Sequence, residues 1–98
     1  MLKQDDSIEF KNDFVYSYLL FSQKILRQVV KIGKGSKGKI IYAHKHGKKT
    51  FCTVDVLKPK ALEIINISKA GKATKTKKYE KLLPDIEKSH LEKIVKKV

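Results

Sequence analysis

The sequence predicts an α+β fold with an N-terminal helix, a three- or four-stranded antiparallel meander and a C-terminal helix. Aromatic and aliphatic residues recur at helical spacing from about Ser7 to about Gln23. The period then changes to two, with glycines between runs of β-branched and aromatic residues, as is typical of strands and turns. From Tyr79 to Val98 the apolar residues again fit an amphipathic helix.

The N-terminal helix rests on Asp6 with Glu9 three residues later, a capping pattern, and on Phe10, Phe14 and Tyr18, which are spaced by four. Its apolar residues cover more than one face. We therefore expect the helix either to be sandwiched in the core or to bind a protein partner or a second copy of the chain.

Two strands, residues 39–46 and 49–57, are predicted on either side of a Gly47-Lys48 turn. This turn places His46 opposite Lys49 and therefore pairs His44 with Phe51, Tyr42 with Thr53, and Ile40 with Asp55. The other face of the hairpin is wholly apolar, and a first hairpin closed by residues 33–38 adds to it, so we expect that face in the core. The residues concerned are Val30, Ile32, Ile41, Ala43, Cys52, Val54 and Val56.

The remaining elements are predicted from shorter patterns. Residues Leu62 to Ile67 are expected to form a fourth strand, with a helix as the alternative. Residues 69–78 are expected to be an extended basic loop. In the C-terminal helix, Pro84 either kinks the helix or opens its second half.

Charge is the strongest functional signal. The chain of 98 residues, which we take as a single basic domain over residues 1–98, carries 23 Lys and Arg against 10 Asp and Glu. Residues 24–60 alone have a net charge of +10, whereas residues 1–23 have −2. So one-sided a charge predicts a polyanionic partner, namely RNA or single-stranded DNA, with RNA favoured. The basic region does not read as an amphipathic helix, so no membrane partner is expected.

Cys52 is the only cysteine, which excludes an internal disulfide and a thiolate zinc cluster. This cysteine usage favours a cytoplasmic location. We expect no cofactor and no metal, since Asp55, opposite Ile40, would lie about 13 Å from His44 along the sheet.

The predicted nucleic-acid surface is the polar face of the hairpin, next to Lys31. Its aromatic rings would stack unpaired bases while lysines hold phosphates, including those of the glycine-rich turn from Gly33 to Gly38. If a terminal helix packs over this face instead, Tyr42 and Phe51 are buried. The predicted binding residues are Lys31, Lys34, Lys37, Lys39, Tyr42, His44, Lys45, Lys48, Lys49, Phe51, Lys58, Lys60, Lys72 and Lys75.

Two other functions are compatible with the sequence. The first is a small metal-independent ribonuclease of the toxin type, in which His44 and His46 act as base and acid, Lys49 stabilises developing charge, and Thr53 or Tyr42 orients the 2′-hydroxyl. The predicted order of a helix followed by an antiparallel sheet resembles the layout of small barnase- or colicin-type ribonuclease toxins, which is an analogy of architecture. The second is a protein-binding inhibitor of mobile-element type that acts through the N-terminal helix.

Overall fold

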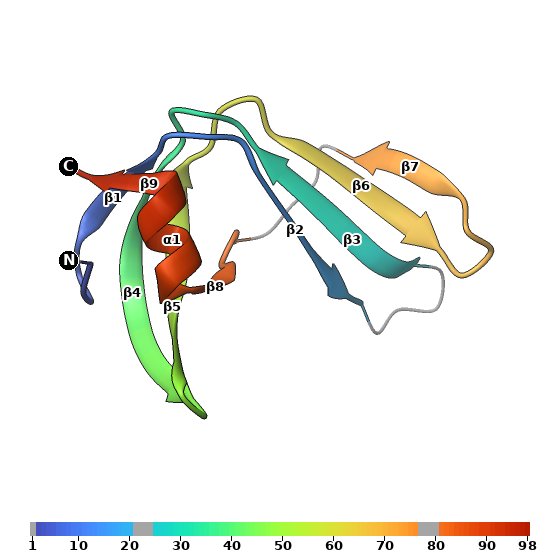
Figure 1. The fold of residues 1–98 in the computed structure, drawn as a ribbon. Coiled ribbons are helices and arrows are strands. Elements are labelled where there is room, and N and C mark those ends of the chain that lie inside the picture. The colour runs from blue at the N-terminus through green and yellow to red at the C-terminus, as the bar shows by residue number, and fades with distance from the viewer. Residues whose placement is uncertain (1, 21–24, 77–80) are drawn as a thin grey trace.

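The computed structural model of the chain describes residues 2–20, 25–76 and 81–98. The described part is mostly β, with two antiparallel sheets and one short helix near the C-terminus (Figure 1). The elements in chain order are β1 (Ser7–Phe10), β2 (Phe14–Leu19), β3 (Ile25–Ile32), β4 (Lys37–His46), β5 (Lys49–Lys58), β6 (Glu63–Ser68), β7 (Ala73–Thr76), β8 (Asp85–Glu87), α1 (Lys88–Ile94) and β9 (Val95–Lys97).

The first sheet has five strands in the order β8-β5-β4-β1-β9, and the second has four in the order β2-β3-β6-β7. The chain changes sheet between β7 and β8 through residues that include 77–80, which lie outside the described part. Three further passages lie wholly within the described residues, from β1 to β2, from β3 to β4 and from β5 to β6. Figure 1 shows these passages together at the top, with the two sheets diverging below them. We call the side of each sheet that carries its buried residues the inner face and the opposite side the outer face.

The predicted N-terminal helix is wrong, because residues 7–10 and 14–19 are the strands β1 and β2. A spacing of four residues fits a helix, but four is also a multiple of the strand period of two. Phe14, Tyr16 and Tyr18 lie on one face of β2, with neighbouring ring centroids 5.8 and 6.3 Å apart. The composition of β2, which is aromatic and β-branched, favours the strand. Residues 21–23 of the predicted helix lie outside the described residues.

This correction also removes the architectural analogy with barnase- and colicin-type toxins, which depended on a leading helix. A protein contact through an N-terminal helix is likewise not available, because the segment is extended.

The C-terminal helix is much shorter than predicted, since only Lys88–Ile94 are helical and short strands flank them on both sides. Upstream of the helix, Leu82, Pro84 and Ile86 are buried at every second position, which is a strand pattern. Backbone N–H groups of Val54 and Val56 donate to the carbonyls of Pro84 and Leu82, so this segment extends the edge of the first sheet. Tyr79 lies outside the described residues.

The predicted hairpin between β3 and β4 does not form, because the two strands belong to different sheets. The intervening glycines instead allow the passages between the sheets to pack tightly. A Cβ atom at Gly33 would lie 2.8 Å from Ala61 Cβ, and one at Gly38 would lie 2.7 Å from the carbonyl oxygen of Asp55. The glycines are therefore needed for close approach of backbones rather than for a free turn.

The β4–β5 hairpin confirms most of the predicted register, because His46 pairs with Lys49, His44 with Phe51, and Tyr42 with Thr53. The predicted pairing of Ile40 with Asp55 is wrong, since a bulge at Ile41 pairs Ile40 with Val54. A bulge inserts one residue and reverses which face the following residues occupy. Ile40 is therefore fully buried, and Ile41, which was expected in the core, is 37% exposed.

Of the two remaining segments, one was predicted correctly and the other was not. The fourth strand is confirmed as β6, which pairs with β3. The segment predicted as an extended basic loop contains strand β7, which pairs with β6 from Ala73 to Thr76. Residues 77 and 78 of that segment lie outside the described residues.

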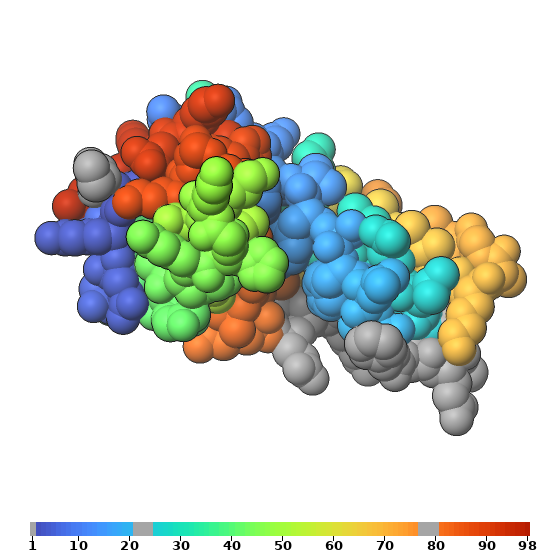
Figure 2. All heavy atoms as spheres, turned by 60° about the horizontal axis from the view of Figure 1, so that its bottom comes forward, coloured from blue at the N-terminus to red at the C-terminus, as the bar shows by residue number. Residues whose placement is uncertain are grey.

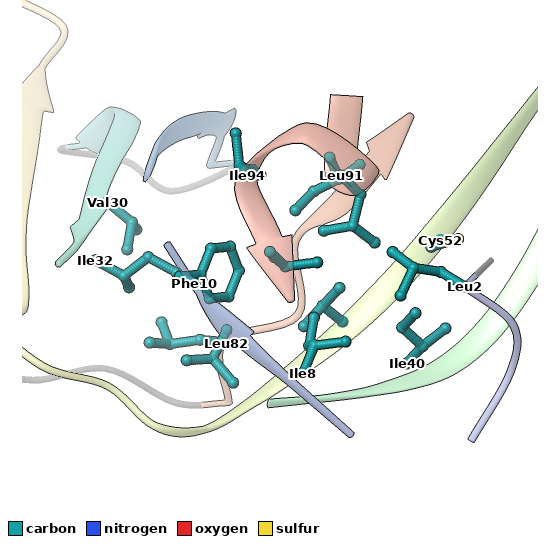
Figure 3. Close-up of a cluster of buried hydrophobic side chains, with 14 of the residues drawn as sticks. Leu2, Ile8, Phe10, Val30, Ile32, Ile40, Cys52, Leu82, Leu91 and Ile94 are labelled. Carbon is teal, nitrogen blue, oxygen red and sulfur yellow. The ribbon is translucent and has the colours of Figure 1, made fainter. Parts of the chain in front are cut away.

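The hydrophobic core lies where the two sheets meet and contains residues from both of them. Phe10 is fully buried beside Ile32 and Leu82 (Figure 3), and α1 adds Leu91 and Ile94 on the inner face of the first sheet. The expected core residues Val30, Ile32, Cys52, Val54 and Val56 are buried, and Ala43 packs against them. Burial raises the pKa of the Cys52 thiol, which is a packing residue of this core.

Candidate nucleic-acid interface

The outer face of the β4–β5 hairpin carries a row of aromatic rings, of which Tyr42 is exposed and His44 and Phe51 are half-buried. We call this surface, made of Tyr42, His44, His46, Lys49, Phe51 and Thr53, the hairpin face. The ring centroids of Tyr42 and His44 are 5.3 Å apart with an interplanar angle of 18°, and those of His44 and Phe51 are 6.0 Å apart at 20°. The tip of the hairpin comes forward in green in Figure 2. Tyr42 is 55% exposed, and α1 packs on the opposite face, so no helix covers the rings.

Two carboxylates that the sequence reasoning missed border the hairpin face. Strand β8 pairs with β5, which places Asp85 beside Thr53 and Glu87 beside Phe51. Thr53 Oγ1 donates to Asp85 Oδ1 at 3.2 Å, and Lys49 Nζ lies 3.8 Å from Glu87 Oε2. The alternation of Leu82, Pro84 and Ile86 was the signal that could have identified this edge strand, and with it the acidic border.

His44 lies between this acidic border and its aromatic neighbours. Its Nε2 is 3.4 Å from Asp85 Oδ2, and its Nδ1 is buried without a hydrogen-bond partner among the described residues. One ring nitrogen therefore faces a carboxylate, and the other is shielded from solvent. A base and acid pair would need imidazole nitrogens that reach the substrate, and only His46, which is exposed at the hairpin tip, offers that access.

The predicted lysines occupy several parts of the surface. Lys37, Lys39 and Lys58 share the outer face of the first sheet with the hairpin face, because the bulge at Ile41 restores Lys39 to that side. Lys45 and Lys48 are exposed at or next to the hairpin tip. Lys37, Lys39, Lys49 and Lys58 therefore share the outer face with the aromatic rings, whereas Lys45, which pairs with Thr50, lies on the inner face.

The other predicted lysines lie away from the hairpin face. Lys31 was expected beside it but belongs to the second sheet, where its Nζ is 3.9 Å from Asp13 Oδ2. Lys75 is also on the outer face of the second sheet, and Lys72 lies in the turn between β6 and β7. Lys34 and Lys60 lie at the passages between the sheets.

The glycine-rich segment from Gly33 to Gly38 is not a phosphate cradle formed by backbone N–H groups. The N–H of Gly33 donates to Lys60 O, and that of Gly35 to Phe10 O. The N–H of Lys34 donates to Asp13 Oδ1, and that of Ser36 to Gly33 O. Since these four donors are already used, any contact of this segment with phosphate must come from its lysine side chains.

The histidines and acidic residues do not assemble into a metal centre. Asp55 forms an ion pair with Lys81 at 3.2 Å, and His90 lies on α1 with its ring 6.1 Å from that of Phe14. Among residues 2–20, 25–76 and 81–98, no group of three or more His, Cys, Asp or Glu side chains is placed to hold an ion.

A cleft of about 930 Å³ lies beside the hairpin face, between the two sheets. Residues of β2 and β3 line one side and residues 81–85 line the other, so that Asp85 borders both the cleft and the hairpin face. Burial raises the pKa of Tyr16 on the wall of this cleft. The Gln28 amide on the same wall accepts from the Tyr18 hydroxyl and donates to Asn66 Oδ1, the latter at 2.8 Å.

The chain shows no significant match to a model of a known protein family, to a curated protein or to a solved structure. In the described part of the chain, no helix is long and apolar enough to span a membrane.

Proposed function

We propose that the protein binds single-stranded nucleic acid through the hairpin face, without cleaving it. The observation that carries the proposal is the nearly parallel row of three rings on the outer face, in which Tyr42 is exposed and His44 and Phe51 are half-buried. Aromatic side chains stack unpaired bases, and Tyr42 is the most accessible ring of the row for such a stack. Unpaired bases are characteristic of RNA loops and ends, so RNA is the favoured target.

The charges around the rings suggest the path of the strand. Asp85 and Glu87 line the β8 border, where a phosphate would meet carboxylates. Lys37 and Lys39 lie on the β4 side, and none of the described carboxylates forms an ion pair with either of them. We therefore place the sugar–phosphate backbone along β4, with the bases over Tyr42 and His44.

The experiment is fluorescence anisotropy with a labelled oligouridylate and the matched oligodeoxyuridylate. Stacking of one base contributes about 1–3 kcal/mol, so Tyr42→Ala should weaken binding about 5- to 100-fold. Val15→Ala is the matched control, because Val15 is equally exposed (56%) but lies on the outer face of the second sheet. Equal loss of affinity in both variants would contradict the proposal.

The charge contribution has its own test. Each phosphate contact lowers the slope of log affinity against log salt by about 0.7 for a single strand. The double variant Lys37→Ala with Lys39→Ala should therefore flatten the slope by about 1.4. Lys93→Ala, a substitution in α1, should leave it unchanged. Binding that does not weaken with salt would refute an electrostatic interface.

The same labelled oligouridylate distinguishes the ribonuclease alternative from binding without cleavage. Incubation of labelled RNA with the protein in chelator should give no cleavage above that of a protein-free sample. Cleavage by the wild-type protein that His44→Ala or His46→Ala abolishes would establish the enzyme instead. The buried Nδ1 of His44 is the structural reason for preferring binding alone.

A further inference from the structure

The four edge strands of the two sheets are protected to very different degrees. Natural edge strands avoid pairing with other chains by means of charged residues, proline or bulges. Strand β7 carries Lys75, β9 carries Lys96 and Lys97, and the β8 edge carries charged residues and follows Pro84. Strand β2, with the sequence Phe-Val-Tyr-Ser-Tyr-Leu, has no charge, no proline and no bulge.

The unprotected edge presents backbone hydrogen-bonding groups. Leu20 N–H donates to Leu26 O, and in an antiparallel ladder only every second residue bonds to its neighbour. The register therefore turns the backbone groups of Val15, Ser17 and Leu19 away from β3. Among the described strands, none pairs with β2 on that side.

A second free edge lies on the other side of the cleft. Val54 and Val56 bond to Pro84 and Leu82, so Leu83 and Asp85 turn their backbone groups away from β5. Residues 16–18 of β2 and residues 81–85 line the same cleft of about 930 Å³. Among the described residues, the cleft is therefore a seam between two sheet edges.

Two charged side chains of the described residues line the seam, and each lies within 4 Å of a titratable side chain. Lys81 Nζ lies 3.2 Å from Asp55, and Asp85 lies 3.4 Å from His44 Nε2. The rest of the lining consists of tyrosine, leucine, serine, glutamine and proline residues. A phosphodiester strand would meet the Asp85 carboxylate, and Lys81, the one described cation that lines the seam, is already paired with Asp55. An uncharged peptide backbone matches both edges.

We propose that this seam binds an extended, uncharged segment of another protein, which adds to β2 as an antiparallel strand. Backbone hydrogen bonds to Val15, Ser17 and Leu19 would supply the affinity, and side chains packed on Tyr16 and Tyr18 would supply the selectivity. This activity is separate from the nucleic-acid binding proposed for the hairpin face.

The sequence of β2 supplies a probe. Residues 15–19 are symmetric in type about Ser17, with tyrosine on both sides and an aliphatic residue beyond each tyrosine. A peptide whose pairing segment reproduces residues 14–20, with lysines appended at its end for solubility, can therefore pair antiparallel with β2, Ser17 against Ser17. The control peptide has the same sequence with an N-methylated serine, which removes the central donor.

The measurement is amide hydrogen exchange by NMR on the full chain, with and without peptide. We expect exchange of the Val15, Ser17 and Leu19 amides to slow by about tenfold or more at saturation, and the N-methylated peptide to have no such effect. Ser17→Pro should abolish binding, because it removes an outward N–H that β3 does not use, and proline is tolerated at such edge positions. Leu19→Lys is a second variant, which keeps the amide and adds a charge at the edge.

Ala73→Pro is the matched control, because it places proline at the opposite edge of the second sheet. Ser68 N–H donates to Lys72 O, so the next residue, Ala73, turns its backbone groups away from β6. The Ala73→Pro variant should bind the peptide as the wild type does. Protection of β7 rather than β2, or binding unaffected by both Ser17→Pro and Leu19→Lys, would overturn the proposal. Protection of the same amides by oligouridylate would also overturn it. So would sedimentation of the peptide-free protein as a concentration-dependent dimer that Ser17→Pro converts to a monomer.

Discussion

Replacement of Ser36 by alanine tests the junction that holds the two sheets at their observed angle. Ser36 is fully buried, its Oγ donates to Gly33 O at 2.7 Å, and Lys60 N–H donates to the same Oγ at 2.8 Å. Gly33 O also accepts from Ser36 N–H at 3.2 Å, so alanine at this position leaves that carbonyl bonded. Only the Lys60 N–H, which the passage from β5 to β6 contributes, loses its partner.

One buried donor without an acceptor costs about 1–3 kcal/mol, so we expect Ser36→Ala to lower the free energy of unfolding by about 2 kcal/mol. For a chain of this size, that change lowers the melting temperature by about 8–16 °C. The assay is urea unfolding followed by circular dichroism, with a constant slope against urea as the check that both variants unfold to the same state.

Ser89→Ala is the matched control, because the Ser89 hydroxyl is exposed and bonds only to Glu87 at 3.1 Å. It should change the free energy of unfolding by no more than about 0.5 kcal/mol. If Ser36→Ala is as stable as Ser89→Ala, the hydroxyl does not hold the junction and the reasoning fails.

Two further predictions concern stability. Gly38→Ala should destabilise the protein by about 1–3 kcal/mol, because its Cβ would lie 2.7 Å from Asp55 O. The loss of unfolding free energy should exceed that of Gly47→Ala, because no atom lies within 4 Å of a Cβ at Gly47 and only its φ of +67° opposes the change. If urea unfolding shows Gly47→Ala to be the less stable variant, the packing argument is contradicted. The backbone N–H of Lys3, with help from Lys97, holds the pKa of Asp6 below its ordinary value of 3.8. Stability from Asp6 is therefore present above that value and lost as the pH falls through the lower folded-state pKa, so acid titration of Asp6→Asn should show a shallower loss of stability below pH 4 than the wild type. If the wild type and Asp6→Asn lose stability equally below pH 4, the Asp6 carboxylate is not selectively stabilised in the folded state.

Local patterns predicted the strands correctly where turn chemistry and alternation agreed. The Gly47 turn fixed the pairing of His44 with Phe51, and with it the shared face of the rings. The prediction failed at the residue next to Tyr42, where the bulge at Ile41 changes the register. A bulge depends on which side chain the core can accommodate, and the core accommodates Ile40.

The helix predictions failed because periodicity alone does not separate a helix from a strand in a short apolar segment. Phe10, Phe14 and Tyr18 satisfy both periods, and only the pairing of β1 with β4 and β9 and of β2 with β3 decides between them. The prediction of the candidate site was incomplete for a related reason, because it also depended on which strands pair. Asp85 could not be placed next to His44 without knowing that residues 82–87 run beside β5.

The sequence by itself determined the charge, the one buried cysteine and the alternation that puts the rings and Lys49 on one side of the β4–β5 hairpin, because these depend on composition and on contacts between near neighbours. The tertiary structure alone decided which sheet each strand joins, which carboxylates border the hairpin face and which edge remains open. Those outcomes depend on contacts between residues far apart in the chain, such as Ser36 with Lys60 and Asp85 with Thr53, and no local pattern encodes them.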